Sequence, residues 1–216
     1  MARRCYGYGK WDAPYWFIGP GQGKGPEEIN NNQERLAAWI RMGRPEVCDC
    51  CCFHREIGED SWHKENPRLQ STWKSLIRLL MAFRGWHPTN DARRVYQRDQ
   101  WGGSNGETCV IELPGLAARN LNSPADRQCY REHRIATIRK RLQEQKRPPT
   151  LVAMYGKGDH SSWEEIAGRT LELNVPASTD VTVFIPVLHP NTHGLTNQYW
   201  IDVGQQLRQT SHSSNI

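Results

Sequence analysis

The chain has 216 residues, of which 37% are hydrophobic, so it can bury the core of one substantial domain, and no linker-like stretch divides it. Its formal net charge is +5, dominated by arginine, and no apolar run approaches the length that spans a bilayer. We therefore expect a cytoplasmic, monomeric protein with no membrane segment, one domain over 1–216 with a polar tail from about 209, and a polyanionic partner such as DNA.

A short apolar run followed by glycines is the first strong feature. Residues 15–18, Tyr-Trp-Phe-Ile, are typical of a strand that is covered on both faces of a parallel sheet. Four glycines follow within residues 19–25, where backbone N–H groups can approach a phosphate, a sugar or a base closely. The spacing matches neither a Walker loop nor a Rossmann turn, and a plain flexible loop remains the alternative.

A cluster of cysteines beside His54 follows a helix that we expect over 33–42. The cluster consists of Cys48, Cys50, Cys51 and Cys52. Only Cys48 and Cys51 form a Cys-x-x-Cys pair, and no second pair follows it. We therefore favour buried, reduced thiols over an iron–sulfur cluster or a zinc ion, and we expect no cofactor.

Helices and strands alternate along the rest of the chain. The pattern predicts helices from 66 to 85, over 124–145, near 161 and over 196–207, strands over 108–113, 150–155 and 181–188, and a long loop over 91–107 that either faces DNA or is simply solvated. The basic residues of the helix over 124–145, among them Arg131 and Arg134, are interpreted as a solvated face. Such alternation is typical of an α/β fold, here a three-layer α/β/α sandwich with a central, mostly parallel four-stranded sheet.

The carboxyl ends of parallel strands meet at one edge of a sheet. That rule should bring together the glycine turn, Glu112 at the end of one strand, the turn that follows Tyr155, and His189 after the last strand.

Two of these strand ends resemble motifs of the uracil-DNA glycosylase superfamily. The matching residues are Ile18-Gly19 with the glycine-rich turn and, near the end of the chain, His189-Pro190; the order of elements agrees from about 15 to 208. The resemblance implies a monofunctional DNA glycosylase, which hydrolyses the N-glycosidic bond of a base flipped out of DNA. It also implies that His189 donates a hydrogen bond to the pyrimidine O2, where negative charge accumulates. A histidine that merely caps the strand is the alternative.

The first motif departs from the family at the positions whose side chains orient the attacking water or stabilise the sugar cation. Relatives carry an acid or an amide there, whereas this chain has Pro20 and Gly21. We expect Gln22, Glu27 or Glu28 to position the water instead, although acids just ahead of a helix also stabilise its dipole.

The residues expected to read the base depart as well. Relatives that read uracil have Asn where this chain has Glu112, and a carboxylate accepts a hydrogen bond from the N4 amino group of cytosine. An ion pair with an arginine such as Arg119 is the alternative. Gly23 stands where relatives that exclude 5-substituted pyrimidines have an aromatic residue, so it leaves space beside C5. Gly21 and Asn191 complete the residues expected at the base.

Together, Glu112 and Gly23 predict a 5-substituted cytosine as the base. In this respect the chain resembles the branch of the superfamily that removes hypermodified bases of phage DNA, such as glucosylated hydroxymethylcytosine, as an antiviral defence. Alternatives are a repair enzyme for uracil or a mismatched base, a silent DNA-binding protein of this fold, and an enzyme that acts on free nucleosides. Contacts with DNA are expected from Lys24, Lys157 and His193, with Leu195 as a wedge that replaces the flipped base.

Overall fold

The computed structural model describes residues 1, 3–20, 28–114 and 124–213, and of residues 28–31, 124–127 and 212–213 it describes the backbone alone. The strands are β1 (Gly7–Tyr8), β2 (Tyr15–Gly19), β3 (Val47–Cys48), β4 (Thr108–Glu112), β5 (Leu151–Tyr155), β6 (Ala177–Ser178) and β7 (Val183–Val187). The α-helices are α1 (Glu28–Arg41), α2 (Cys50–Glu56), α3 (Trp73–Phe83), α4 (Asn90–Asp99), α5 (Pro124–Glu144), α6 (His160–Ala167) and α7 (Asn197–Ser213). Two 3-10 helices, η1 (Asp60–Trp62) and η2 (Lys157–Asp159), lie between them.

The strands form one mixed sheet in the order β3-β1-β4-β2-β5-β7-β6. The four long strands β4, β2, β5 and β7 are mutually parallel, as the sequence predicts. The prediction of a four-stranded sheet is wrong, because the described part of the sheet has seven strands. The three additional strands have two residues each, too few to give a periodic signal. Strand β1 pairs antiparallel with β4 and parallel with β3, and β6 pairs antiparallel with β7.

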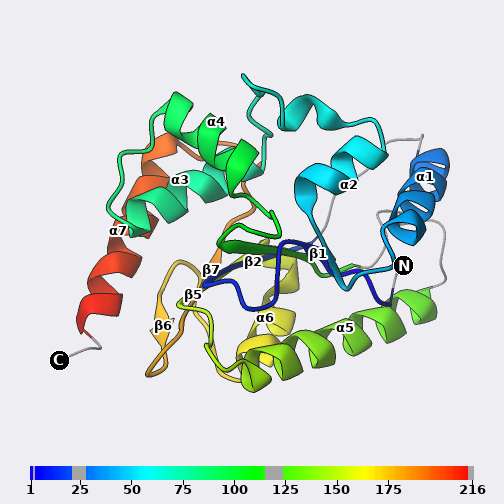
Figure 1. Cartoon of the computed structure of the whole chain (residues 1–216). Coiled ribbons are helices and arrows are strands. Elements are labelled where there is room, and N and C mark those ends of the chain that lie inside the picture. Colours follow the sequence, from blue (N-terminus) through cyan, green and yellow to red (C-terminus); the bar gives the residue numbers. More distant parts are fainter. Residues whose placement is uncertain (2, 21–27, 115–123, 214–216) are drawn as a thin grey trace.

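Helices lie on both faces of the sheet (Figure 1). On one face, apolar side chains of α1 to α4 and α7 pack against Phe17 of β2, and on the other, α5 and α6 pack against Trp16 and Ile18. These three side chains are fully buried, which explains the uninterrupted apolar run. The chain therefore leaves β2 towards one face and the adjacent β5 towards the other. Ligands of open α/β sheets commonly bind at the carboxyl ends of such a strand pair.

Residues 91–107 do not form the expected long loop. Residues 90–99 are helix α4, whose N-cap is Thr89, with its side chain accepting a hydrogen bond from the Ala92 N–H. The buried face of α4 carries the polar Arg93 and Gln97, so the helix lacks the apolar period that would identify it in the sequence. Trp101, expected in the same loop, is buried in the core.

The ends of three helices also differ from the expectation. Helix α1 begins at Glu28 rather than near residue 33, and α3 begins at Trp73 rather than at residue 66. Helix α7 continues to Ser213, beyond the predicted start of the polar tail. Within the described ranges, no helix is both long enough and apolar enough to cross a membrane.

Candidate functional site

A cavity of about 270 Å³ opens where β4, β5 and β7 end. Its described lining contains aromatic, acidic and amide side chains from both the sheet and the helices. These residues are His54, Glu59, Trp62, Gln70, Ser71, Thr72, Trp73, Val110, Glu112, Tyr155, His189 and Asn191. Glu112, His189 and Asn191, which the sequence places at strand ends, thus meet at one cavity.

The other predicted site residues do not line the described part of this cavity. Lys157 and His193 are exposed, and Leu195, the predicted wedge, is half-buried against the core cluster. Gly21, Gln22, Gly23, Lys24, Glu27 and Arg119 lie outside the described residues, and of Glu28 the structure describes the backbone.

His189 is held in one tautomer by its neighbour. The backbone N–H of Asn191 donates to Nδ1 of His189 at 3.1 Å, so this nitrogen is the acceptor. Burial lowers the pKa of His189 below its ordinary value of 6.5, which keeps the ring neutral at pH 7. A neutral ring with an acceptor at Nδ1 carries its proton on Nε2. The imidazole therefore offers one N–H donor at the cavity.

The Tyr155 ring packs between the His189 imidazole and Gly19 at the end of β2. Its ring centroid lies 5.7 Å from that of His189, and a Cβ atom on Gly19 would lie 1.9 Å from its Cζ atom. Only glycine at position 19 lets the ring pack there. Burial, and then the negative charge of Glu112, raise the pKa of Tyr155, so the phenol stays protonated and can donate a hydrogen bond.

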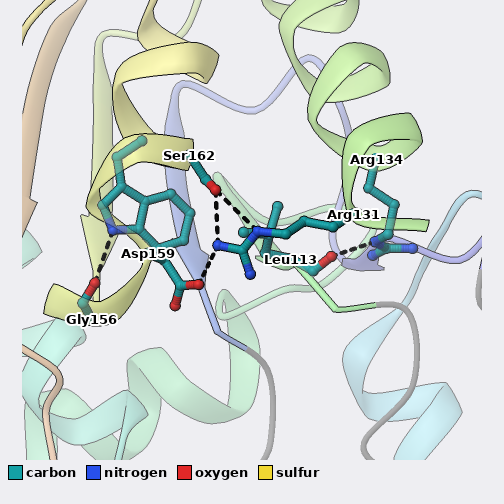
Figure 2. Close-up of polar contacts among 7 residues, drawn as sticks. Leu113, Arg131, Arg134, Gly156, Asp159 and Ser162 are labelled. Carbon is teal, nitrogen blue, oxygen red and sulfur yellow. Dashed lines mark hydrogen bonds and ion pairs between the residues drawn. The ribbon is translucent and has the colours of Figure 1, made fainter. Parts of the chain in front are cut away.

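Helix α5 fixes the strand ends through two arginines (Figure 2). Arg134 is completely buried and donates to the backbone carbonyls of Cys5, Glu112 and Leu113 at 2.5–2.8 Å. The prediction of a solvated basic face is therefore wrong for Arg134. Its N–H groups donate to carbonyls at the end of β4 and in the segment that precedes β1.

The second arginine reaches the segment after β5. Arg131 is half-buried, donates to the hydroxyl of Ser162 at 2.8 Å and forms an ion pair with Asp159, as Figure 2 shows. Trp163 donates to the Gly156 carbonyl at 3.0 Å in the same region. Arg131 is thus also a structural residue, in contrast to the predicted solvated face.

One wall of the cavity, here called the helical wall, consists of lining residues from α2 to the start of α3, and the buried amide of Gln97 holds it in place. Gln97 of α4 accepts a hydrogen bond from the Gln70 N–H at 2.9 Å and donates to the carbonyls of Trp62 and Arg68 at 3.0 Å. Trp62, Gln70 and their neighbours at the start of α3 were not identified from the sequence. Nothing in their local pattern marks them, because their approach to the strand ends depends on this tertiary contact.

A half-buried arginine provides positive charge near the acidic residues of the cavity. Arg35 donates to the hydroxyl of Tyr8 at 2.8 Å. Burial tends to lower the pKa of Arg35, but the interaction with Tyr8 and the negative charges of Glu112 and Glu59 outweigh it and raise the pKa overall. The guanidinium therefore stays charged and places a positive charge near Glu112 and Glu59.

Three further ligand-type groups adjoin the cavity through His54. They are the side chains of Cys50, His54 and His63, all buried. Burial and the neighbouring His63 lower the pKa of His54 to about 3, and burial raises the pKa of the Cys50 thiol. Of the four cysteines in the sequence cluster, Cys48 and Cys50 are buried as expected, whereas Cys51 is half-buried and Cys52 exposed.

No protein-family model matches this sequence, and a search of curated proteins found no match. The chemistry of the cavity therefore carries the functional conclusion.

Proposed function

We propose that the chain is a monofunctional DNA glycosylase, related to the uracil-DNA glycosylase superfamily, whose cavity receives a base flipped out of DNA. The observation that carries the proposal is the neutral imidazole of His189, with Nδ1 occupied by the Asn191 N–H, at the cavity where three parallel strands end. Its remaining N–H is suited to stabilise negative charge on pyrimidine O2 as the glycosidic bond breaks.

The size and lining of the cavity support a base as the ligand. Its volume of about 270 Å³ is slightly below the ~300–1,000 Å³ of sites for drug-sized molecules. Trp73 and Tyr155 contribute aromatic surface of the kind on which bases stack. Stacking and phosphate contacts offset the few kcal/mol that flipping costs. For these contacts we retain Lys157 and His193, which are exposed, and Lys24.

Hydrolysis needs a water molecule as well as a stabilised leaving group. Water adds to C1′ while the base leaves as an anion, and a carboxylate takes the proton of the water. We assign the carboxylate to Glu27 or Glu28, with the amide of Gln22 orienting the water, and add Glu59, a carboxylate that lines the cavity, as a further candidate. The reaction needs no cofactor.

Glu112 supports cytosine rather than uracil as the base. Its carboxylate accepts from an N4 amino group and repels the O4 of uracil. Replacing Glu112 by Gln supplies both a donor and an acceptor, so Glu112→Gln should shift the ratio of cytosine-type to uracil excision by about 10-fold to 100-fold towards uracil. An unchanged ratio would remove Glu112 from base recognition.

The test measures abasic sites in DNA. Oligonucleotides that contain uracil, a mismatched base, cytosine, 5-hydroxymethylcytosine or its glucosylated form are incubated with the chain and then cleaved with alkali. We expect cleavage at a 5-substituted cytosine. Release of uracil or the mismatched base alone would identify a repair glycosylase and overturn the substrate assignment. Salt-sensitive binding without abasic sites would indicate a silent DNA-binding protein, and activity on free nucleosides alone would exclude a DNA enzyme.

A further inference from the structure

Three buried side chains converge behind the helical wall of the cavity. Cys50 and His54 lie on α2, and His63 follows η1 directly. Their exposed fractions are 0%, 1% and 6%. The Cys50 Sγ lies 3.4 Å from the His54 Nδ1 and 3.9 Å from the His63 Nε2, and the two nitrogens lie 3.3 Å apart.

These separations resemble the edges of a tetrahedron around a zinc ion. With Zn–S of about 2.3 Å and Zn–N of about 2.0–2.1 Å, tetrahedral ligands stand about 3.6 Å apart for sulfur and nitrogen and about 3.4 Å apart for two nitrogens. One thiolate and two imidazoles also form a donor set that zinc accepts, leaving a fourth position for water.

The buried ring of His63 has no other evident polar role. In the part of the chain that the structure describes, its Nδ1 has no hydrogen-bond partner. Its Nε2 contacts the Cys50 Sγ and the His54 Nδ1. Burying a polar imidazole costs free energy unless its nitrogens are compensated, and a metal ion bound by all three atoms would compensate them.

We propose that Cys50, His54 and His63 bind a zinc ion. Without metal, the His54 Nδ1–H donates to the Cys50 carbonyl at 2.8 Å. On binding, His54 moves its proton to Nε2 and Cys50 releases its thiol proton to solvent, so one proton leaves for each zinc ion bound. This proposal departs from the sequence expectation, which weighed the cysteine cluster beside His54, favoured reduced thiols over a bound metal and did not consider His63.

The zinc site would also determine the shape of the cavity. The segment between His54 and His63 carries Glu59 and Trp62, which both line the cavity, and its regular structure beyond α2 is limited to the short η1. A metal ion that joins the two ends of this segment restricts where these side chains can lie. The proposal does not depend on the glycosylase activity.

The test is metal binding in the absence of DNA. The full chain is stripped with a chelator and titrated with zinc alone, and then with cobalt, whose visible absorption reports tetrahedral thiolate coordination. We expect one metal ion per chain, lost in Cys50→Ala and in His63→Ala. Cys109→Ala is the matched control, because this thiol is equally buried but lies in β4, and it should bind as the wild type does.

A second measurement uses crystals of the wild-type chain grown with zinc, and it does not require the variants to fold. Anomalous scattering at the zinc edge should give a peak about 2.0–2.3 Å from the three ligand atoms. No zinc binding by the wild type, a peak elsewhere, or binding that survives in His63→Ala would overturn the site. Because none of these readouts uses a nucleic acid, failure of the zinc site and failure of the glycosylase are distinguishable.

Discussion

The cavity has two walls of different construction. The sheet wall carries Glu112, Tyr155 and His189, and its backbone is fixed by strand pairing and by the buried Arg134. The helical wall carries His54, Glu59 and Trp62 from α2, η1 and the turn between them, where side-chain contacts replace strand pairing. The two walls show that the groups beside Nδ1 determine what a histidine can do. The Asn191 N–H donates to Nδ1 of His189, so this ring keeps its proton on Nε2 and is a donor. Nδ1 of His54 instead lies beside the Cys50 Sγ and the His63 Nε2.

The largest expected effect comes from removing the donor of the sheet wall. His189→Ala should lower the excision rate about 10²-fold to 10³-fold, which is the usual loss when one oxyanion donor is removed. Zinc binding should be unchanged, because His189 is not among the three ligand-type groups. His133→Ala, which removes an exposed imidazole of α5 outside the described cavity lining, is the control in single-turnover excision assays. Equal losses in both variants would contradict the role of His189.

The next effect concerns the support of the same wall. Arg134→Met keeps the apolar volume but removes charged donors from the carbonyls of Cys5, Glu112 and Leu113. We expect the free energy of unfolding in urea to fall by about 3 kcal/mol. Lys140→Met on the exposed face of α5 should change it by no more than about 0.5 kcal/mol. A loss that is equally small for Arg134→Met would show that these bonds do not stabilise the strand end.

Replacing one amide side chain should destabilise the helical wall. Gln97→Leu removes the partners of Gln70, Trp62 and Arg68 and leaves their backbone groups unsatisfied, at a cost of about 2 kcal/mol. Amide hydrogen exchange over residues 62–73 should accelerate more than exchange in β5. The exposed Gln128→Leu is the control. Uniform acceleration throughout the chain would mean that the two walls are not independently held.

The smallest effect is a pH dependence that belongs to His189. Because burial lowers its pKa in the folded state, the unfolded chain binds the proton more readily, and folding stability falls as pH decreases below about 6.5. As the pH falls from 8 to 5, the unfolding free energy of the wild type should therefore decrease relative to that of His189→Gln. A constant difference would show that the imidazole is not buried as described.

The sheet wall could be predicted from the sequence, whereas the helical wall could not. Apolar runs mark β2, β4, β5 and β7, and the ends of parallel strands must meet, so Glu112 and His189 could be placed together before the fold was known. Trp62 and Gln70 reach the cavity through Gln97, a polar residue on a helix without an apolar period.

Buried polar residues are the hardest to place from the sequence. Arg134 carries the charge of a surface residue, and its burial depends on carbonyls that are distant in the sequence, such as that of Cys5. His63 is separated from Cys50 by 13 positions and belongs to no familiar ligand spacing. Such residues become recognisable only when tertiary structure brings their partners together.

The central claim is that His189 donates to a base held in this cavity, and a structure of the chain with the excised base bound tests it most directly. We expect the base beside Trp73 and Tyr155, with its O2 about 2.7–3.2 Å from the His189 Nε2. A base bound elsewhere, or an Nε2 atom that faces away from the base, would contradict the account.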